Sequence, residues 1–234
     1  MTSADRTRRV PVPQRVLAHA PLQTFRLRRG RVSPTQADAL DRLWARWGVD
    51  VDGTPLDLPA LFGRTAPVVL EVGAGMGEAT AAAAAADLAR DLLAVDVHTP
   101  GHGTLLRRLE EAGLSHVRVA DGDARVLLGD MLAPGSLDEV RIWFPDPWPK
   151  ARHAKRRLVQ PAFLALVASR LRPGGTLHVV TDWAPYAAQV ADALSASPLR
   201  LVSRERPASR PTTRFEQQGL AAGRRAHDLV AVRP

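Results

Sequence analysis

A strand that leads through a glycine-rich turn into a helix is the feature that most constrains the fold of this chain. The apolar run Val68–Val72 is followed by Gly73-Ala74-Gly75-Met76-Gly77 and then by an alanine-rich segment. Glycine allows the backbone to turn sharply and to approach a ligand with no Cβ in the way. The pattern predicts a sheet of parallel strands with a binding site at their carboxyl ends.

The alternation of strand and helix continues along the chain. Five apolar runs predict strands, at 68–72, 92–97, 116–120, 139–144 and 176–181. Apolar residues at helical spacing predict helices, at 76–89, 102–113, 124–130, 160–171 and 184–195. Two later apolar stretches, Leu199–Ser203 and Asp228–Val232, predict an antiparallel edge pair. The expected fold class is therefore α/β, with a doubly wound, mostly parallel, seven-stranded sheet.

The length of 234 residues fits one sizeable domain with short extensions. Residues 1–31 are rich in Arg and Pro and have no clear periodicity, so we expect a flexible basic arm there. Ser33-Pro34 is typical of a helix start, with Ser as the cap and Pro in the first turn. Residues 32–234 are expected to form a single domain, with a loop at 50–65.

Composition excludes several classes of protein. The chain has no cysteine, so disulfides, Cys-based zinc sites and thiol catalysis are excluded. The seven histidines form no metal-ligand pattern, and no metal is expected. The N-terminus lacks the apolar core of a signal peptide, and no apolar run is long enough to span a bilayer. We expect a cytoplasmic protein without membrane contact and infer no obligate protein partner.

Positive charge is concentrated in three segments. Residues 1–31 carry a net charge of +7, and residues 150–157 and 200–234 carry +5 each. Together they carry +17, so the rest of the chain carries −9 of the overall +8. A basic surface on an acidic body is typical of nucleic-acid binding. A solvated basic tail without a partner is the alternative interpretation.

Acidic residues flank the glycine-rich turn. Glu71 precedes the turn and Glu78 follows it. A diphosphate prefers bare amides and positive charge, whereas a sulfonium and an amino group are attracted by carboxylates. The spacing GxGxG also differs from the GxGxxG of dinucleotide enzymes. The turn therefore favours S-adenosylmethionine over NAD as the cofactor.

Two further acids follow the next two predicted strands. Asp96 ends the second strand, where a carboxylate can accept hydrogen bonds from a ribose diol. Asp123 follows the third strand. It either holds the adenine amino group or caps the next helix, and the sequence leaves both roles open.

The most specific stretch of the chain follows the fourth predicted strand. It reads Phe144-Pro145-Asp146-Pro147-Trp148-Pro149 and continues into the basic run Lys150–Arg157. The prolines on both sides of Asp146 restrict its backbone and hold the carboxylate at the end of the strand. Trp148 either stacks on a base or packs in the core. A Pro-rich turn before a solvated basic helix is the purely structural alternative.

This stretch resembles the signature of the bacterial tRNA (guanine-N7-)-methyltransferase family. Four other segments resemble motifs of that family in the same order, namely 71–77, 95–101, 181–183 and 210–216. The resemblance covers about residues 24–230. The chain departs from the family pattern at Asp96, where Glu is more frequent, at Pro149 (His) and at Ala154 (Asn). The ending His227-Asp228-Leu229 also lacks the usual Trp.

The resemblance implies a class I methyltransferase fold and assigns roles residue by residue. The cofactor S-adenosylmethionine would be bound by Glu71, Gly73, Gly75, Gly77, Asp96, Asp123 and Asp146, and Asp146 would also be catalytic. The substrate would be contacted by Lys150, Asp182, Thr213, Arg214, Phe215 and Glu216. RNA would be contacted by Arg152, His153, Ala154, Lys155, Arg156 and Arg157. The implied target is N7 of the guanine at position forty-six, in the variable loop of tRNA.

The chemistry of guanine N7 fits this set of residues. N7 has a free lone pair and no proton, so the reaction needs alignment and electrostatic support rather than a general base. Asp146 or Asp182 could stabilise the cation or accept hydrogen bonds from the guanine edge. Lys150 could reach guanine O6 or a phosphate.

Three competing hypotheses remain at this point. An enzyme that modifies a small molecule or uses NAD could share the fold but would not need the basic segments. A catalytically silent RNA-binding module would not need three acids at one sheet edge. A methyltransferase that acts on another RNA base would be expected to carry a different turn after the fourth strand.

Overall fold

Eight strands form one sheet in the computed structural model, which describes residues 23–25 and 31–234. The strand order is β1-β4-β3-β2-β5-β6-β8-β7. The parallel strands are β1 (Gly48–Asp50), β2 (Val68–Val72), β3 (Asp91–Asp96), β4 (Val117–Asp121), β5 (Leu137–Trp143) and β6 (Leu171–Thr181). The antiparallel edge is made by β7 (Arg200–Ser203) and β8 (His227–Val232).

The doubly wound, mostly parallel sheet is confirmed, but the predicted number of strands is too low by one. The additional strand is β1, where Gly48–Asp50 pair with Val119–Asp121 of β4. Three residues are too few to show the alternation of polar and apolar side chains that marks a strand in sequence. Their extended conformation is fixed by the neighbouring strand and not by their own pattern.

Helices connect the strands. They are α1 (Pro34–Trp47), α2 (Leu58–Phe62), α3 (Glu78–Ala86), α4 (Thr99–Glu111), α5 (Ala124–Val126), α6 (Pro161–Arg170), α7 (Ala184–Ser195) and α8 (Arg214–Ala221). A π-helical turn, η1 (Leu127–Met131), continues α5, and a 3₁₀ helix, η2 (Ala151–Arg156), follows the Pro-rich loop. The predicted start of α1 is confirmed, because the Ser33 hydroxyl accepts a hydrogen bond from the Gln36 amide. The loop predicted at 50–65 is wrong at Leu58–Phe62, which form α2 after the cap residue Asp57, and the sequence pattern does not predict α8.

The sheet separates two hydrophobic cores. Side chains alternate between the two faces along a strand. In β3, Leu93 and Val95 join a core with α6 and α7, whereas Leu92 and Ala94 join a core with α1 and α4. Both faces are therefore covered, which explains the continuous apolar runs that mark these strands in the sequence.

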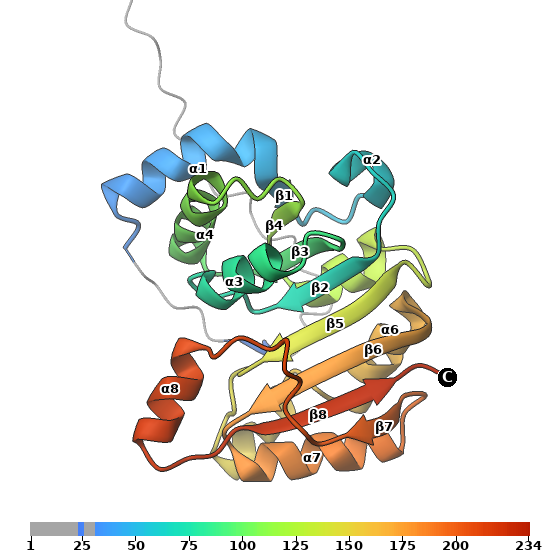
Figure 1. Ribbon diagram of the computed structural model, residues 1–234. Coiled ribbons are helices and arrows are strands. Elements are labelled where there is room, and N and C mark those ends of the chain that lie inside the picture. Colours follow the sequence, from blue (N-terminus) through green and yellow to red (C-terminus); the bar gives the residue numbers. More distant parts are fainter. Residues whose placement is uncertain (1–22, 26–30) are drawn as a thin grey trace, which may run out of the picture.

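The strand order reverses between β2 and β5. From β2 the chain moves outward through β3 and β4, and it then returns to place β5 on the other side of β2. The connections diverge at this point, which leaves a crevice at the carboxyl ends of the two strands. Figure 1 shows α8 beyond the carboxyl ends of β5 and β6, at the same edge of the sheet.

Most of the arm predicted at residues 1–31 lies outside the described residues. Within the described part of the chain, no helix is long and apolar enough to cross a membrane.

Candidate functional site

A cavity opens at the carboxyl edge of the sheet, where the strand order reverses. Loops that follow four different strands contribute to its wall, together with α8 and a short piece of the N-terminal segment. The lining residues are Thr24, Phe25, Val72, Gly73, Gly75, Val95, Asp96, Val97, His98, Gly122, Asp123, Ala124, Trp143, Phe144, Pro145, Asp146, Leu158 and Phe215. Residues that the sequence analysis selected from four motifs therefore share one cavity.

The three glycines of the turn after β2 have two different functions. Gly73, Gly75 and Gly77 all have positive φ angles, of 91°, 57° and 75°. A Cβ added to Gly73 or Gly75 would meet no atom within 4 Å, so these two residues leave room beside the cavity. A Cβ on Gly77 would lie 2.6 Å from the Cβ of Leu105, so this glycine permits close packing of α3 on α4. The cradle beside Gly73 and Gly75 fits a ligand that approaches the backbone closely.

Asp96 joins this turn to the loop after β3. Its carboxylate accepts hydrogen bonds from the backbone amides of Gly75 at 2.7 Å, Val97 at 2.6 Å and His98 at 3.0 Å. The three amides fix the orientation of the carboxylate on the cavity wall. This is the position that a ribose diol would require.

Asp123 caps α5, which is one of the two roles that the sequence predicts for it. Its carboxylate accepts a hydrogen bond from the Arg125 amide at 2.8 Å and forms an ion pair with the Arg125 guanidinium. It also lines the cavity, so the cap does not remove it from the site. Contact with an adenine amino group stays a prediction.

Glu71 lies beneath the glycine turn and is not among the residues that line the cavity. It is 3% exposed, and its Oε1 accepts a hydrogen bond from the Thr80 hydroxyl at 2.9 Å. Its Oε2 has no hydrogen-bond partner among the described residues. Burial raises the pKa of Glu71 to about 7, although the Thr80 hydrogen bond and the charge of Arg141 both lower it.

Asp146 lines the cavity from a loop whose backbone is strained. Phe144 and Trp148, on either side of Asp146, have φ angles of 55° and 41°, which non-glycine residues rarely adopt. Such strain persists only where the surroundings determine the conformation, and it is concentrated at functional sites. The Phe144 amide is fixed by a hydrogen bond to the Val180 carbonyl of β6 at 2.8 Å.

Trp148 is packed into the protein, which was one of its two predicted roles. It is 6% exposed, and its indole Nε1 donates to the Thr24 carbonyl at 3.2 Å. The guanidinium of Arg156 lies 5.1 Å from the centre of the Trp148 ring. The buried ring of Trp148 is therefore not placed to stack on a nucleobase. Trp148 instead holds the loop that carries Asp146.

Arg157 belongs to the same support and not to an exposed basic surface. It is 6% exposed, and its guanidinium donates to the carbonyls of Pro147 at 2.9 Å and Trp148 at 3.5 Å. It also lies over the ring of Tyr186 and donates to Gln189. The family resemblance predicts an RNA contact for Arg157. We correct this to a structural role, because its donors are used inside the protein.

The remainder of the basic segment is more accessible. The 3₁₀ helix η2 contains no buried residue, and Lys150, Arg152 and Lys155 are exposed. His153 packs edge-on against Trp148, with ring centres 5.7 Å apart. The exposed cations therefore directly follow the loop of Asp146.

The predicted substrate residues of the C-terminal part separate into two groups. Phe215 is 43% exposed and lines the cavity. Thr213 is buried and caps α8, and Glu216 is buried in ion pairs with Arg206 and Arg210. Arg214 is exposed. Asp182 is half-buried, is not among the cavity-lining residues, and accepts a hydrogen bond from Arg224 at 2.7 Å.

Several residues of the wall are not among the predicted site residues. Trp143, Phe144 and His98 lie at or directly after the ends of predicted strands, so their position at the carboxyl edge is a usable signal. Thr24 and Phe25 line the cavity from a segment without any recognisable pattern. Their participation depends on contacts with distant parts of the chain.

Taken together, the doubly wound sheet, the acid-flanked glycine turn and the acid after the next strand define a class I, S-adenosylmethionine-dependent methyltransferase. Two solved structures share this fold. One is an antibiotic-related methyltransferase, with a TM-score of 0.54 and 19% identity, over 77% of this chain and 96% of that one. The other is phosphoethanolamine N-methyltransferase 2 of Haemonchus contortus in complex with S-adenosyl-L-methionine, with a TM-score of 0.51 and 17% identity, over 88% of this chain and 61% of that one.

Sequence similarity identifies the family within this class. The model of a family described as "Putative methyltransferase" matches residues 65–229. The tRNA (guanine-N(7)-)-methyltransferase of Streptomyces avermitilis is 56% identical over 89% of this chain and 74% of that protein. The enzyme of the same name from Nitrosomonas eutropha is 46% identical over 91% of this chain and 97% of that protein. The chain belongs to the family of tRNA (guanine-N(7)-)-methyltransferases.

The packing of α4 on the glycine turn yields a first prediction. A Cβ on Gly101 would lie 1.9 Å from the carbonyl oxygen of Gly75, so Gly101→Ala must displace the turn. We expect a loss of about 1–3 kcal/mol in the free energy of unfolding, as for other overpacked sites, and weaker binding of S-adenosylmethionine. Urea denaturation and calorimetric titration measure the two effects.

Gly129→Ala is the matched control, since a Cβ there meets no atom within 4 Å and the φ angle is not positive. If Gly101→Ala behaves like this control in both measurements, the assigned packing is wrong.

The raised pKa of Glu71 yields a prediction about stability and pH. The ordinary pKa of Glu71 is 4.5, and in the folded protein it is about 7. Between these two pH values, Glu71 retains a proton in the folded state that it has lost in the unfolded state. Stability therefore falls as pH rises through this window. Glu71→Gln removes this titration, so the variant does not lose this stability as the pH rises. The free energy of unfolding of the variant minus that of the wild type should therefore increase by up to about 3 kcal/mol between pH 4.5 and 7.

Urea denaturation at pH 5 and pH 8 measures this difference. Glu78→Gln, at an exposed site paired with Arg108, is the control and should show little dependence on pH. A pH-independent difference for Glu71→Gln would contradict the assigned pKa.

Proposed function

We propose that this protein transfers a methyl group from S-adenosylmethionine to N7 of the guanine at position forty-six, in the variable loop of tRNA, and that it acts in the cytoplasm. The observation that carries the proposal is the position of Asp146. It lines the same cavity as the glycine turn and Asp96, and exposed cations follow it directly in η2. The names of the related proteins supply the substrate class.

The residues on the cavity wall fit the cofactor. Gly73 and Gly75 would allow its amino acid part to approach the backbone, and Asp96 would accept hydrogen bonds from the ribose hydroxyls. Asp123 lies on the cavity wall, in the loop between β4 and α5, where it would face the adenine. When bound, the cofactor supplies an electrophilic methyl group on a sulfonium sulfur.

The contribution of the chain to the reaction is alignment and charge. Guanine N7 needs no general base, so the protein must bring the lone pair in line with the methyl group and stabilise the transferred positive charge. Asp146 lines the cavity, whereas the carboxylate of Asp182 is bound to Arg224 and lies outside its wall. This difference supports Asp146 over Asp182 as the group beside the reacting atoms.

The exposed basic segment supports an RNA substrate over a small molecule. Lys150, Arg152 and Lys155 follow the loop of Asp146, so a phosphate backbone bound there would bring a neighbouring base to the cavity. Phe215, partly exposed on the cavity wall, offers a flat surface for an unstacked guanine.

Transfer of labelled methyl groups from S-adenosylmethionine to bulk tRNA, followed by nucleoside analysis, tests the proposal. The label should appear in 7-methylguanosine, and a tRNA transcript with another base at position forty-six should accept none. Label in a different nucleoside would show that the enzyme acts on another RNA base, and the proposal would then fail.

The role of Asp146 is tested by Asp146→Asn. The substitution preserves size but removes the charge that supports the transfer, so the single-turnover rate at saturating tRNA should fall about 100-fold. The tRNA dissociation constant should change far less. Asp130→Asn, at an exposed position in η1, is the matched control. An unchanged rate in Asp146→Asn would mean that this carboxylate is structural.

The role of the basic segment is tested by replacing Lys150, Arg152 and Lys155 together with Ala. Loss of phosphate contacts should weaken tRNA binding and lower the slope of log affinity against log salt by about 0.7–0.9 per contact. Replacing the exposed residues Arg46, Arg107 and Arg172 with Ala removes the same charge and should leave the slope near the wild-type value. Equal slopes in both triple variants would rule out this segment as the RNA contact.

A further inference from the structure

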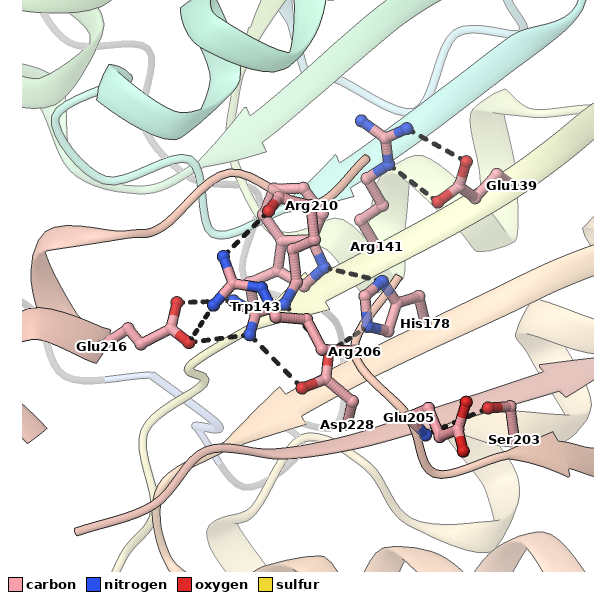
Figure 2. Close-up of polar contacts among 10 residues, drawn as sticks. All are labelled: Glu139, Arg141, Trp143, His178, Ser203, Glu205, Arg206, Arg210, Glu216 and Asp228. Atoms are coloured by element: carbon pink, nitrogen blue, oxygen red, sulfur yellow. Dashed lines mark hydrogen bonds and ion pairs between the residues drawn. The ribbon is translucent and has the colours of Figure 1, made fainter. Parts of the chain in front are cut away.

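A continuous chain of buried polar side chains runs from Trp143 of the cavity wall to Glu216 of α8 (Figure 2). Trp143 ends β5, and Phe215 lies in the first turn of α8. Both line the cavity, yet they are 72 positions apart in the sequence. Four side chains form this chain, which we call the relay: His178 of β6, Asp228 of β8, Arg210 from the segment before α8, and Glu216 of α8.

The first half of this relay fixes the indole of Trp143. Its Nε1 donates to Nδ1 of His178 at 3.2 Å, and Nε2 of His178 lies 2.8 Å from the carboxylate of Asp228. Because an indole N–H can only donate, Nδ1 must be unprotonated and Nε2–H must donate to Asp228. His178 is 4% exposed, and its Nε2–H tautomer thus determines the orientation in which the indole of Trp143 is held.

The second half fixes the start of α8. The Arg210 guanidinium forms an ion pair with Asp228, to which Nη2 donates at 3.3 Å, and its Nη1 and Nη2 donate to the two oxygens of Glu216 at 2.8 Å. The Nε atom lies 2.9 Å from Asp228 but forms no hydrogen bond with a described residue. Glu216 is the third residue of α8, where a carboxylate often turns back to the helix cap. Here it is held by Arg210 and by Arg206, which binds it at 2.6 Å. Phe215 directly precedes Glu216 in the first turn of α8, so the backbone that carries its side chain is held at the same place.

The relay is balanced in charge. Two arginines oppose two carboxylates, and the histidine is neutral in the required tautomer. Burial by itself raises the pKa of Asp228, but the His178 hydrogen bond and the charge of Arg210 bring it below its ordinary value. A buried network of this kind supports a unique geometry more than it supports stability.

We propose that Arg210 is a positioning residue for methyl transfer. Through Glu216 it sets the place of Phe215, and through Asp228 and His178 it sets the place of Trp143. The inference rests on the proposed function, in which the guanine enters this cavity. It also gives Glu216, predicted from the sequence to contact the substrate, a role that acts through Phe215.

Arginine is required at position 210 because one planar guanidinium group binds two carboxylates, those of Glu216 and Asp228. Nη1 and Nη2 of Arg210 donate to the two oxygens of Glu216, and Nη2 also donates to Asp228. Lysine would keep the positive charge but offers a point charge that cannot span both partners in this geometry. Arg210→Lys therefore separates the geometry of the relay from its charge.

The first measurement is the single-turnover rate of tRNA methylation. Arg210→Lys should lower it about 10- to 100-fold at saturating tRNA, as expected for a small misplacement of the reacting groups. The dissociation constant for S-adenosylmethionine should remain within about threefold of the wild type, since Asp96 and the glycine turn are not part of the relay. An unchanged rate would overturn the proposal.

The second measurement does not depend on activity. The chain has five tryptophans, and the ¹H–¹⁵N indole signal of Trp143 can be assigned by its loss in Trp143→Phe. Arg210→Lys and Glu216→Gln should both shift this signal, although the indole N–H is bonded to His178 and to neither of these residues. An unshifted signal in a folded variant would overturn the relay. Glu216→Gln, which preserves size and shape, decides the question if Arg210→Lys does not fold.

Arg42→Lys is the matched control. Arg42 also binds both oxygens of a glutamate, Glu110, at 3.0 and 3.2 Å, and an aspartate, Asp38, through Nε at 2.9 Å. This constellation is exposed and joins α1 to Glu110 of α4, so Arg42→Lys should leave the rate and the indole signal unchanged. If the wild type forms no 7-methylguanosine, the proposed function fails, and the indole signal still tests the relay.

Discussion

The carboxylate of Asp96 holds together the part of the molecule on which the site depends. It accepts hydrogen bonds from the amides of Gly75, Val97 and His98, and so joins the loops after β2 and β3 into one wall. Gly101 of α4 packs on the same turn, where no larger residue would fit. The carboxyl edge of a parallel sheet supplies the place, and these contacts give it a fixed shape.

The loop of Asp146 is held in a different way. Its backbone includes two non-glycine residues with positive φ, so the loop is not stable by itself. The guanidinium of Arg157 supports it from within by binding two of its carbonyls, and Trp148 anchors it to Thr24. A cation that the sequence assigns to the RNA surface thus maintains the loop, while the exposed cations next to it remain available to a substrate.

Buried charge has a consistent role in this protein. Arg157, Arg210 and Glu216 all occur in motifs that the sequence marks as functional, yet each is nine-tenths buried or more. Buried charges need ion-pair or hydrogen-bond partners, because an unpaired buried charge costs several kcal/mol. The partners come from distant segments, which makes these residues suited to fixing the positions of the side chains that do reach the cavity.

The sequence by itself determined the alternating strands and helices, the glycine turn, and the edge on which Asp96, Asp123 and Asp146 meet. These features depend on local periodicity and on the rule that parallel strands share one carboxyl edge. Tertiary structure decided the strand β1, the burial of Trp148 and Arg157, and the pairing of Glu216 with Arg210. It also decided that Thr24 and Phe25 reach the cavity. Trp148 and Thr24 are 124 positions apart, and His178 and Asp228 are 50 apart. Whether a polar side chain faces a ligand or another part of the chain depends on such distant partners, and local pattern carries no information about them.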